Sequence, residues 1–73
     1  MELIKLKPGE HGIISNIGGD SKLAKRLLAL GCIEGTDVSL KAIAPLGDPL
    51  IINFRGFDLA IRKKDAKNII LLT

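Results

Sequence analysis

The side chains that could carry out chemistry in this sequence are few and widely spaced. His11 is the only histidine and Cys32 is the only cysteine among 73 residues. Catalysis needs positioned partners, such as a nucleophile beside a base or two carboxylates flanking a bond, and the sequence shows no such arrangement. No pair of metal ligands has the C-x-x-C or H-x-x-x-H spacing of a zinc or iron site. We therefore expect a binding protein without enzymatic activity, a metal site or a cofactor.

Each of these two side chains has an ordinary structural interpretation. His11 stands where a strand is predicted to begin, which favours a solvated or hydrogen-bonded residue at a sheet edge. Cys32 follows Gly31, where burial as a small apolar residue is expected instead of reactivity. The alternative hypothesis is a labile iron or zinc site built from scattered single ligands, namely Glu10, His11, Cys32, Glu34 and Asp48.

The composition predicts one small globular domain that covers residues 1–73. Hydrophobic residues make up 47% of the chain, which is too apolar for a disordered segment, and a chain this short forms one core. A lone cysteine excludes an internal disulfide and favours a reducing compartment. No segment approaches the roughly 18 apolar residues that span a bilayer. We expect a soluble, cytoplasmic domain.

The charge permits an anionic partner without requiring one. The net charge is +3 with a pI of about 9.3. Barrel-type binders of single-stranded nucleic acid stack bases on aromatic side chains, and only Phe54 and Phe57 could serve here. We therefore expect no nucleic-acid partner, and a nucleic-acid-binding small barrel remains a further alternative. The basic residues fall into two groups: Lys22, Lys25 and Arg26, and then Arg62, Lys63, Lys64 and Lys67.

The clearest local element is a helix of about eleven residues that ends near Gly31. Asp20 or Ser21 can accept a hydrogen bond from the free amides of its first turn. Gly31 can adopt the positive φ that closes a helix. Apolar residues at i, i+4 and i+7 predict one stripe that faces the core, formed by Leu23, Leu27 and Leu30.

Turn signals about every ten residues predict a mainly β domain, a small barrel of about five strands. The helix lies between strands 1 and 2, and a short helical turn at 63–68 precedes the last strand, which is expected to close the sheet. Val38, Leu40 and Ala42 alternate with polar residues and should face the core. Arg55-Gly56 should form a two-residue hairpin turn. The predicted strands are 11–17, 36–44, 50–54, 57–62 and 69–72.

Adjacent apolar residues in the strands place apolar side chains on both faces of the sheet. This occurs at Ile13-Ile14, at Ile51-Ile52 and in the run 69–72. One short helix can shield only part of the second face. Two outcomes remain open: a fully covered core, or an exposed surface that binds a partner or a second copy of the chain.

The order and spacing of several short segments resemble the FeoA family over nearly the whole chain. The most specific segment is Ala-Pro-Leu-Gly-Asp-Pro at 44–49. The others are Pro-Gly-Glu at 8–10, Arg-Leu-Leu-Ala-Leu-Gly at 26–31, Glu-Gly-Thr at 34–36 and the stretch 59–66. The chain departs from the family at two positions. Members often carry a larger aliphatic residue or methionine in place of Cys32, and commonly a proline in place of Glu34.

This resemblance implies an SH3-like small barrel with the helix packed across it, and it implies a partner. The partner is FeoB, the membrane ferrous iron transporter with a cytoplasmic GTP-binding domain, which the family assists or regulates from the cytosol. The chain would then meet the membrane only through the transporter. A related barrel forms the C-terminal domain of diphtheria-toxin-repressor-type regulators, but the upstream helices of those proteins are absent here, which favours an accessory protein.

We expect the helix and the loop 45–49 to form the docking surface for this partner. A loop bounded by two prolines loses little conformational entropy on binding, and it should expose Leu46. A secondary hypothesis is that Arg55 or Arg62 supplies a positive charge to the GTP site, as arginine fingers do. Self-association also remains open. The expected partner-binding residues are Leu28, Leu30, Pro45, Leu46, Gly47, Asp48, Pro49 and Arg62.

Overall fold

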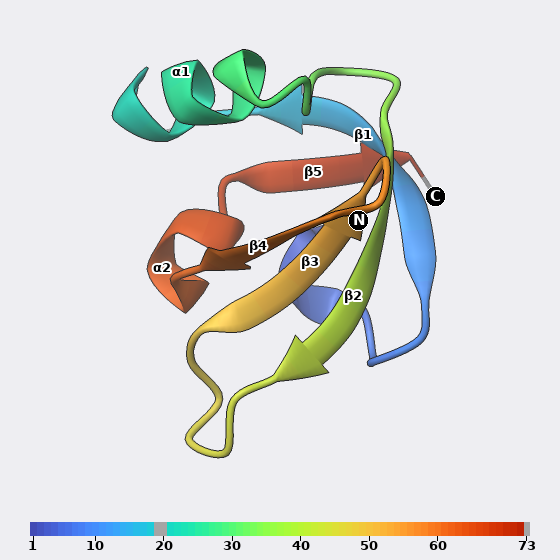
Figure 1. The fold of residues 1–73 in the computed structure, drawn as a ribbon, viewed down its shortest axis with the longest axis vertical. Coiled ribbons are helices and arrows are strands. Elements are labelled where there is room, and N and C mark those ends of the chain that lie inside the picture. Colours follow the sequence, from blue (N-terminus) through green and yellow to red (C-terminus); the bar gives the residue numbers. More distant parts are fainter. Residues whose placement is uncertain (19–20, 73) are drawn as a thin grey trace.

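The computed structural model describes residues 1–18 and 21–72, which form five strands and three short helical segments (Figure 1). The strands, the main helix and the later helical turn follow the predicted chain order, and the first helical segment was not predicted. The ends of the predicted strands agree with the observed ones to within one residue, and the helical turn is shorter than 63–68. The elements are η1 (Leu3–Lys5), β1 (His11–Ile17), α1 (Ser21–Ala29), β2 (Asp37–Ile43), β3 (Leu50–Phe54), β4 (Phe57–Ile61), α2 (Lys63–Ala66) and β5 (Ile69–Leu72).

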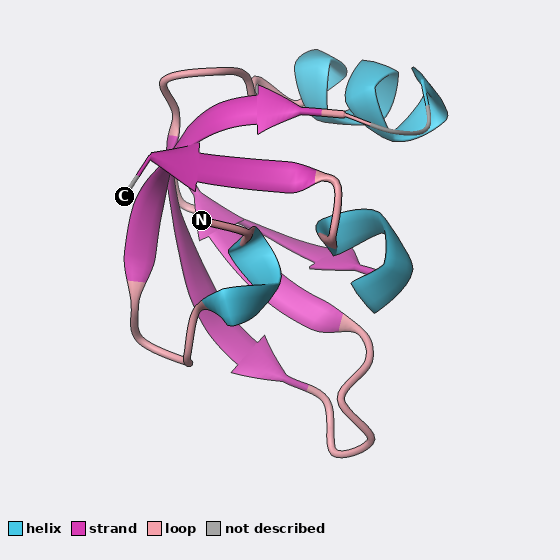
Figure 2. Ribbon diagram, turned by 180° about the vertical axis from the view of Figure 1, so that it is seen from behind, coloured by secondary structure: helices cyan, strands magenta, loops and turns pink. Residues whose placement is uncertain are grey.

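The strands form one antiparallel sheet in the order β4-β3-β2-β1-β5. The prediction that the last strand closes a barrel is wrong, because the outer edge of β5 is already occupied by the N-terminus (Figure 2). The Met1 amino group donates to the Leu71 carbonyl at 2.9 Å, and the Leu71 amide donates back to the Met1 carbonyl at 2.6 Å. Glu2 forms a bridge with Ile70. The sheet therefore curls without closing, and β4 has one strand neighbour.

The predicted leucine stripe of α1 is confirmed at two of its three positions. Leu23 and Leu27 are buried in the core, as amphipathic spacing requires. Leu30 was expected to continue the stripe, and this is wrong because the helix ends before it and its side chain is exposed. The predicted capping by Asp20 or Ser21 lies outside the residues and side chains that the structure describes.

A Schellman turn ends α1 after nine residues. The Cys32 amide donates to the Leu27 carbonyl at 2.8 Å, and the Gly31 amide donates to the Leu28 carbonyl at 3.0 Å. Gly31 has φ +84°, so its predicted role at the helix end is confirmed. This motif brings the residue after the glycine against the last turn, which explains why Cys32 is fully buried. In the described part of the chain, no helix is long and apolar enough to span a bilayer.

Buried and exposed side chains alternate along β2 as predicted only up to the point where its pairing with β3 becomes irregular. Val38 and Leu40 are fully buried, as predicted, but Ala42 is exposed, so its assignment to the core is wrong. The register shifts between Leu40 and Ala42, and an extra residue in one strand breaks the period of two. At the other end of the sheet, the predicted hairpin turn is confirmed: Arg55 has φ 53° and Gly56 has φ 77°.

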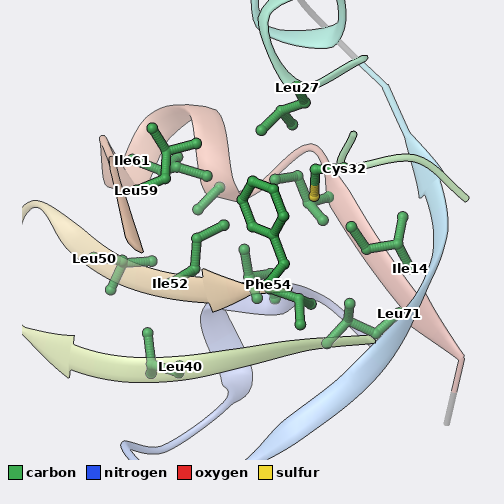
Figure 3. Close-up of a cluster of buried hydrophobic side chains, with 14 of the residues drawn as sticks. Ile14, Leu27, Cys32, Leu40, Leu50, Ile52, Phe54, Leu59, Ile61 and Leu71 are labelled. Carbon is green, nitrogen blue, oxygen red and sulfur yellow. The ribbon is translucent and has the colours of Figure 1, made fainter. Parts of the chain in front are cut away.

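Phe54 lies at the centre of one apolar core, below Leu27 and close to Cys32 (Figure 3). The core also holds Leu3 of η1, which the strand and helix patterns did not reveal. All helical segments contribute their buried residues to this same cluster. They therefore fill the interior of the curled sheet, and among the described residues no helix covers the second face of its strands.

We predict that the two phenylalanines differ sharply in their contribution to stability. Their rings are 5.6 Å apart, but Phe54 is 1% exposed and Phe57 is 45% exposed. Phe54→Ala should lower the free energy of unfolding by about 3–5 kcal/mol because it leaves a cavity, and Phe57→Ala by about 1 kcal/mol. Urea titrations followed by circular dichroism measure both values. Equal losses would contradict the placement of Phe54 in the core.

Candidate functional site

Three exposed apolar side chains lie at or just beyond the C-terminal end of α1, and we call them the helix-end patch: Leu28, Leu30 and Ile33. Leu28 is 64% exposed, and the other two are also exposed. Leu28 and Ile33 line a shallow groove together with Ile17 and Cys32. The Schellman turn produces this patch, because it ends the helix while the chain is still apolar. The backbone beneath it is fixed by the helix and its cap, so the patch is preorganised.

Two exposed apolar side chains lie at the end of β2 and in the loop that follows it, and we call them the loop tip: Ile43 and Leu46. The Gly47 amide donates to the Ala44 carbonyl at 2.7 Å and closes a tight turn, with Gly47 at φ 85°. Leu46 stands at the apex of this turn and is 96% exposed. The expectation of an exposed Leu46 on an ordered loop is therefore confirmed.

The second half of that loop is tied to α2 and does not project. Asp48 accepts a hydrogen bond from the Lys63 amide through Oδ1 at 3.0 Å. Asp48 and Pro49 line a groove together with side chains of α1, β4 and α2, including Arg26 and Arg62. We call this the charged groove. Its lining is Leu23, Arg26, Asp48, Pro49, Ala60, Ile61, Arg62 and Asp65.

The structure divides the eight predicted docking residues among these three places. Leu28 and Leu30 belong to the helix-end patch, residues 45–47 to the turn at the loop tip, and Asp48, Pro49 and Arg62 to the charged groove. Figure 1 shows α1 and the β2–β3 loop at opposite ends of the long axis, along which the chain extends 27 Å. The predicted residues thus do not form one compact surface.

Arg55 lies against the end of α1, where it has a structural role. A Cβ atom placed on Gly31 would be 3.6 Å from Nη1 of Arg55, so the guanidinium lies next to the C-terminal turn of the helix. Cations are favoured there by the helix dipole. Burial raises the pKa of the Cys32 thiol, and the positive charge of Arg55 opposes this shift to a smaller extent.

The polar side chains of the sheet pair across its strands. His11 Nδ1 lies 3.0 Å from Oδ1 of Asp37, and both side chains are exposed, which confirms His11 as a hydrogen-bonded surface residue. Asp58 accepts from Asn53 at 2.7 Å and from Lys41 at 2.6 Å. These two hydrogen bonds, that from Asn53 first, hold the pKa of Asp58 below its ordinary value.

The residues named for the two alternative functions are not brought together. Among the described residues, no three histidine, cysteine, aspartate or glutamate side chains form a group that could hold a metal. Cys32 is buried in the core, whereas Asp48 faces α2. For nucleic acid, Phe54 is inside the core, so of the two phenylalanines only Phe57 retains an exposed ring.

Comparison with known proteins gives a consistent result. A model of the FeoA domain matches residues 1–71. The FeoA protein of Chlorobium tepidum is 31% identical, with a TM-score of 0.92, and the match covers 100% of this chain and 71% of that one. The FeoA of Stenotrophomonas maltophilia, solved with zinc and described as a procaryotic SH3 domain protein, is 25% identical, with a TM-score of 0.82 over 97% of this chain and 88% of that one.

A relative from Porphyromonas gingivalis joins this domain to a transporter. It is a fusion of Fe(2+) transport protein A with the Fe(2+) transporter FeoB, and it is 29% identical over 69 residues. The match covers 94% of this chain but only 8% of the fusion protein.

The open antiparallel sheet with a helix between its first two strands defines a small domain of SH3-like fold. The chain belongs to the FeoA family, which is involved in ferrous iron transport.

We predict that Cys32 makes the stability of the fold depend on pH in the alkaline range. A thiol whose pKa is raised above its ordinary value of 9.0 in the folded state stabilises the fold below that pH, and the contribution is lost as the pH rises further. The free energy of unfolding should therefore fall more between pH 8 and pH 10 in the unmodified chain than in Cys32→Ala. Urea titrations at both values test this, and parallel losses would contradict it.

Proposed function

We propose that this chain is a cytoplasmic accessory protein of ferrous iron uptake that binds the cytoplasmic GTP-binding part of a FeoB-type transporter. The fusion in Porphyromonas gingivalis is the main support for the proposal, because it contains a homologous domain and the transporter in one polypeptide. Covalent linkage keeps two partners at high effective concentration. Separate chains that work together must obtain the same proximity from a binding surface.

The helix-end patch is the main contact in this proposal. Leu28 and its neighbours expose apolar area on a backbone that is already fixed by the helix cap. Preorganised groups lose little entropy on binding, and apolar anchors that become fully desolvated account for most of the affinity at interfaces. Its complement on the transporter would be an apolar groove or helix face.

The loop tip is the second contact. Leu46 is almost fully exposed, and its turn is closed by a backbone hydrogen bond. Because α1 and this loop lie at opposite ends of a 27 Å axis, a partner that touches both must cover the long side of the molecule, across the charged groove. Arg62 would then face the partner. Arg55 is left out of this surface, because its guanidinium lies against Gly31.

We predict that Leu28→Glu weakens binding to the cytoplasmic part of the transporter at least tenfold, because a charge would enter an apolar contact. Leu46→Asp should weaken binding less, since the loop tip is the second contact. Isothermal titration calorimetry measures both changes. Leu72→Glu is the matched control, because Leu72 is 60% exposed, similar to Leu28, but lies on β5 outside the patch.

Circular dichroism and urea titration of each variant establish that the fold is intact before affinities are compared. Equal affinity for Leu28→Glu, Leu46→Asp and the unmodified chain would reject both contacts. Loss of binding in Leu72→Glu with retention in Leu28→Glu would move the contact to the outer face of β5. Absence of any heat with the unmodified chain, at concentrations where the chain is folded, would reject the proposed partner.

A further inference from the structure

The two edge strands of the sheet differ in their backbone pairing. The outer edge of β5 is occupied by Met1 and Glu2. The outer edge of β4 has no strand neighbour in the described part of the chain, because β4 is the last strand of the sheet order. An edge strand with unpaired backbone groups is a template for pairing with another strand. In Figure 1, β4 lies at the end of the curled sheet beside β3.

The backbone groups that β4 offers outward follow from its pairing. Phe57 lies opposite Phe54 next to a two-residue turn, and such a flanking pair exchanges hydrogen bonds. Hydrogen-bonded positions alternate along an antiparallel ladder, so Asp58 and Ala60 direct their N–H and C=O groups away from β3. The Arg62 amide continues this row, but its carbonyl accepts from two amides of the α2 turn.

The exposed side chains of this edge have a self-complementary order. Asp58, Ala60 and Arg62 are exposed and lie at alternate positions of one face. If two copies of β4 pair antiparallel with Ala60 opposite Ala60 of the second copy, each Asp58 lies opposite an Arg62. A register centred on Asp58 would instead place two carboxylates opposite each other, which is destabilising. The charges therefore favour the register centred on Ala60 over one centred on Asp58.

We propose that β4 is a homodimer interface, at which two copies of this chain join their sheets across a two-fold axis centred on Ala60. The pairing forms four backbone hydrogen bonds: two between the Ala60 residues, and two from the Arg62 amides to the Asp58 carbonyls. Ala60 allows the strands to approach closely. Asp58 is already oriented by Lys41 and Asn53, and a carboxylate with about four acceptor sites has capacity left for Arg62.

The dimer is expected to be weak and dependent on concentration. One strand pair buries less than the 1,200 to 2,000 Å², approximately, of a standard stable interface, and opposite charges across strands contribute modestly. The interface also leaves the helix-end patch and the loop tip outside the strand pair. Ala60 and Arg62 also line the charged groove, so a transporter that covers this groove would compete with the second copy for the edge of β4.

Sedimentation equilibrium from about 10 μM to about 1 mM measures the dissociation constant of the dimer. We expect a concentration-dependent monomer–dimer equilibrium for the unmodified chain. Ala60→Pro removes the central donors and is compatible with an edge strand, so it should leave a folded monomer. Arg62→Asp should weaken the dimer roughly tenfold or more, because it places like charges opposite each other. Lys25→Asp, with the same change in net charge on α1, should leave it unchanged.

Charge exchange tests the register itself. Asp58→Arg and Arg62→Asp should each dimerise more weakly alone than the unmodified chain, and an equimolar mixture should form heterodimers, because every charge then meets its opposite. Amide spectra of each variant verify that the fold is retained. A chain that stays monomeric up to about 1 mM, a dimer that Ala60→Pro leaves unchanged, or single variants that do not recover on mixing would overturn the proposal.

Discussion

The packing of α1, through Leu23 and Leu27, into the core that holds Phe54 is the interaction on which the rest of the structure depends. These side chains attach α1 to the interior of a sheet that does not close on itself. The Schellman turn then places Cys32 in the same core while Leu28 and Leu30 remain outside. One helix end therefore fixes both a part of the core and the apolar patch that we assign to the transporter, so the stability of the domain and its binding surface share a physical origin.

The open sheet gives the domain two different edges with separate consequences. At β5, the Met1 backbone satisfies groups that a closed barrel would have satisfied by pairing β5 with β4. At β4, the groups remain available, and the order of Asp58, Ala60 and Arg62 suits a second copy of the same strand. A domain of 73 residues can thus carry a heterologous contact at its helix end and a self-complementary one at its sheet edge.

Local features of the sequence predicted the strands, the hairpin turn and the end of α1, because glycine, proline and short-range periodicity determine these elements. Leu30 and Ala42 were assigned to the core wrongly: a helix cap and a shift in strand register interrupt a period that sequence alone extrapolates. The prediction that the sheet closes was wrong for a longer-range reason, which is the pairing of Met1 with Leu71. The exposure of Leu46 was predictable from its turn, but its distance from α1 depends on how the sheet curls, which no local pattern encodes.

The central claim is that the helix-end patch binds the cytoplasmic part of a FeoB-type transporter. An isotope-labelled sample of this chain, titrated with that part of the transporter and followed by amide chemical shifts, tests it residue by residue. We expect the largest changes at Leu28, Leu30 and Ile33, and smaller ones at Leu46. Changes confined to β1 and β5, or none at saturating partner, would contradict it.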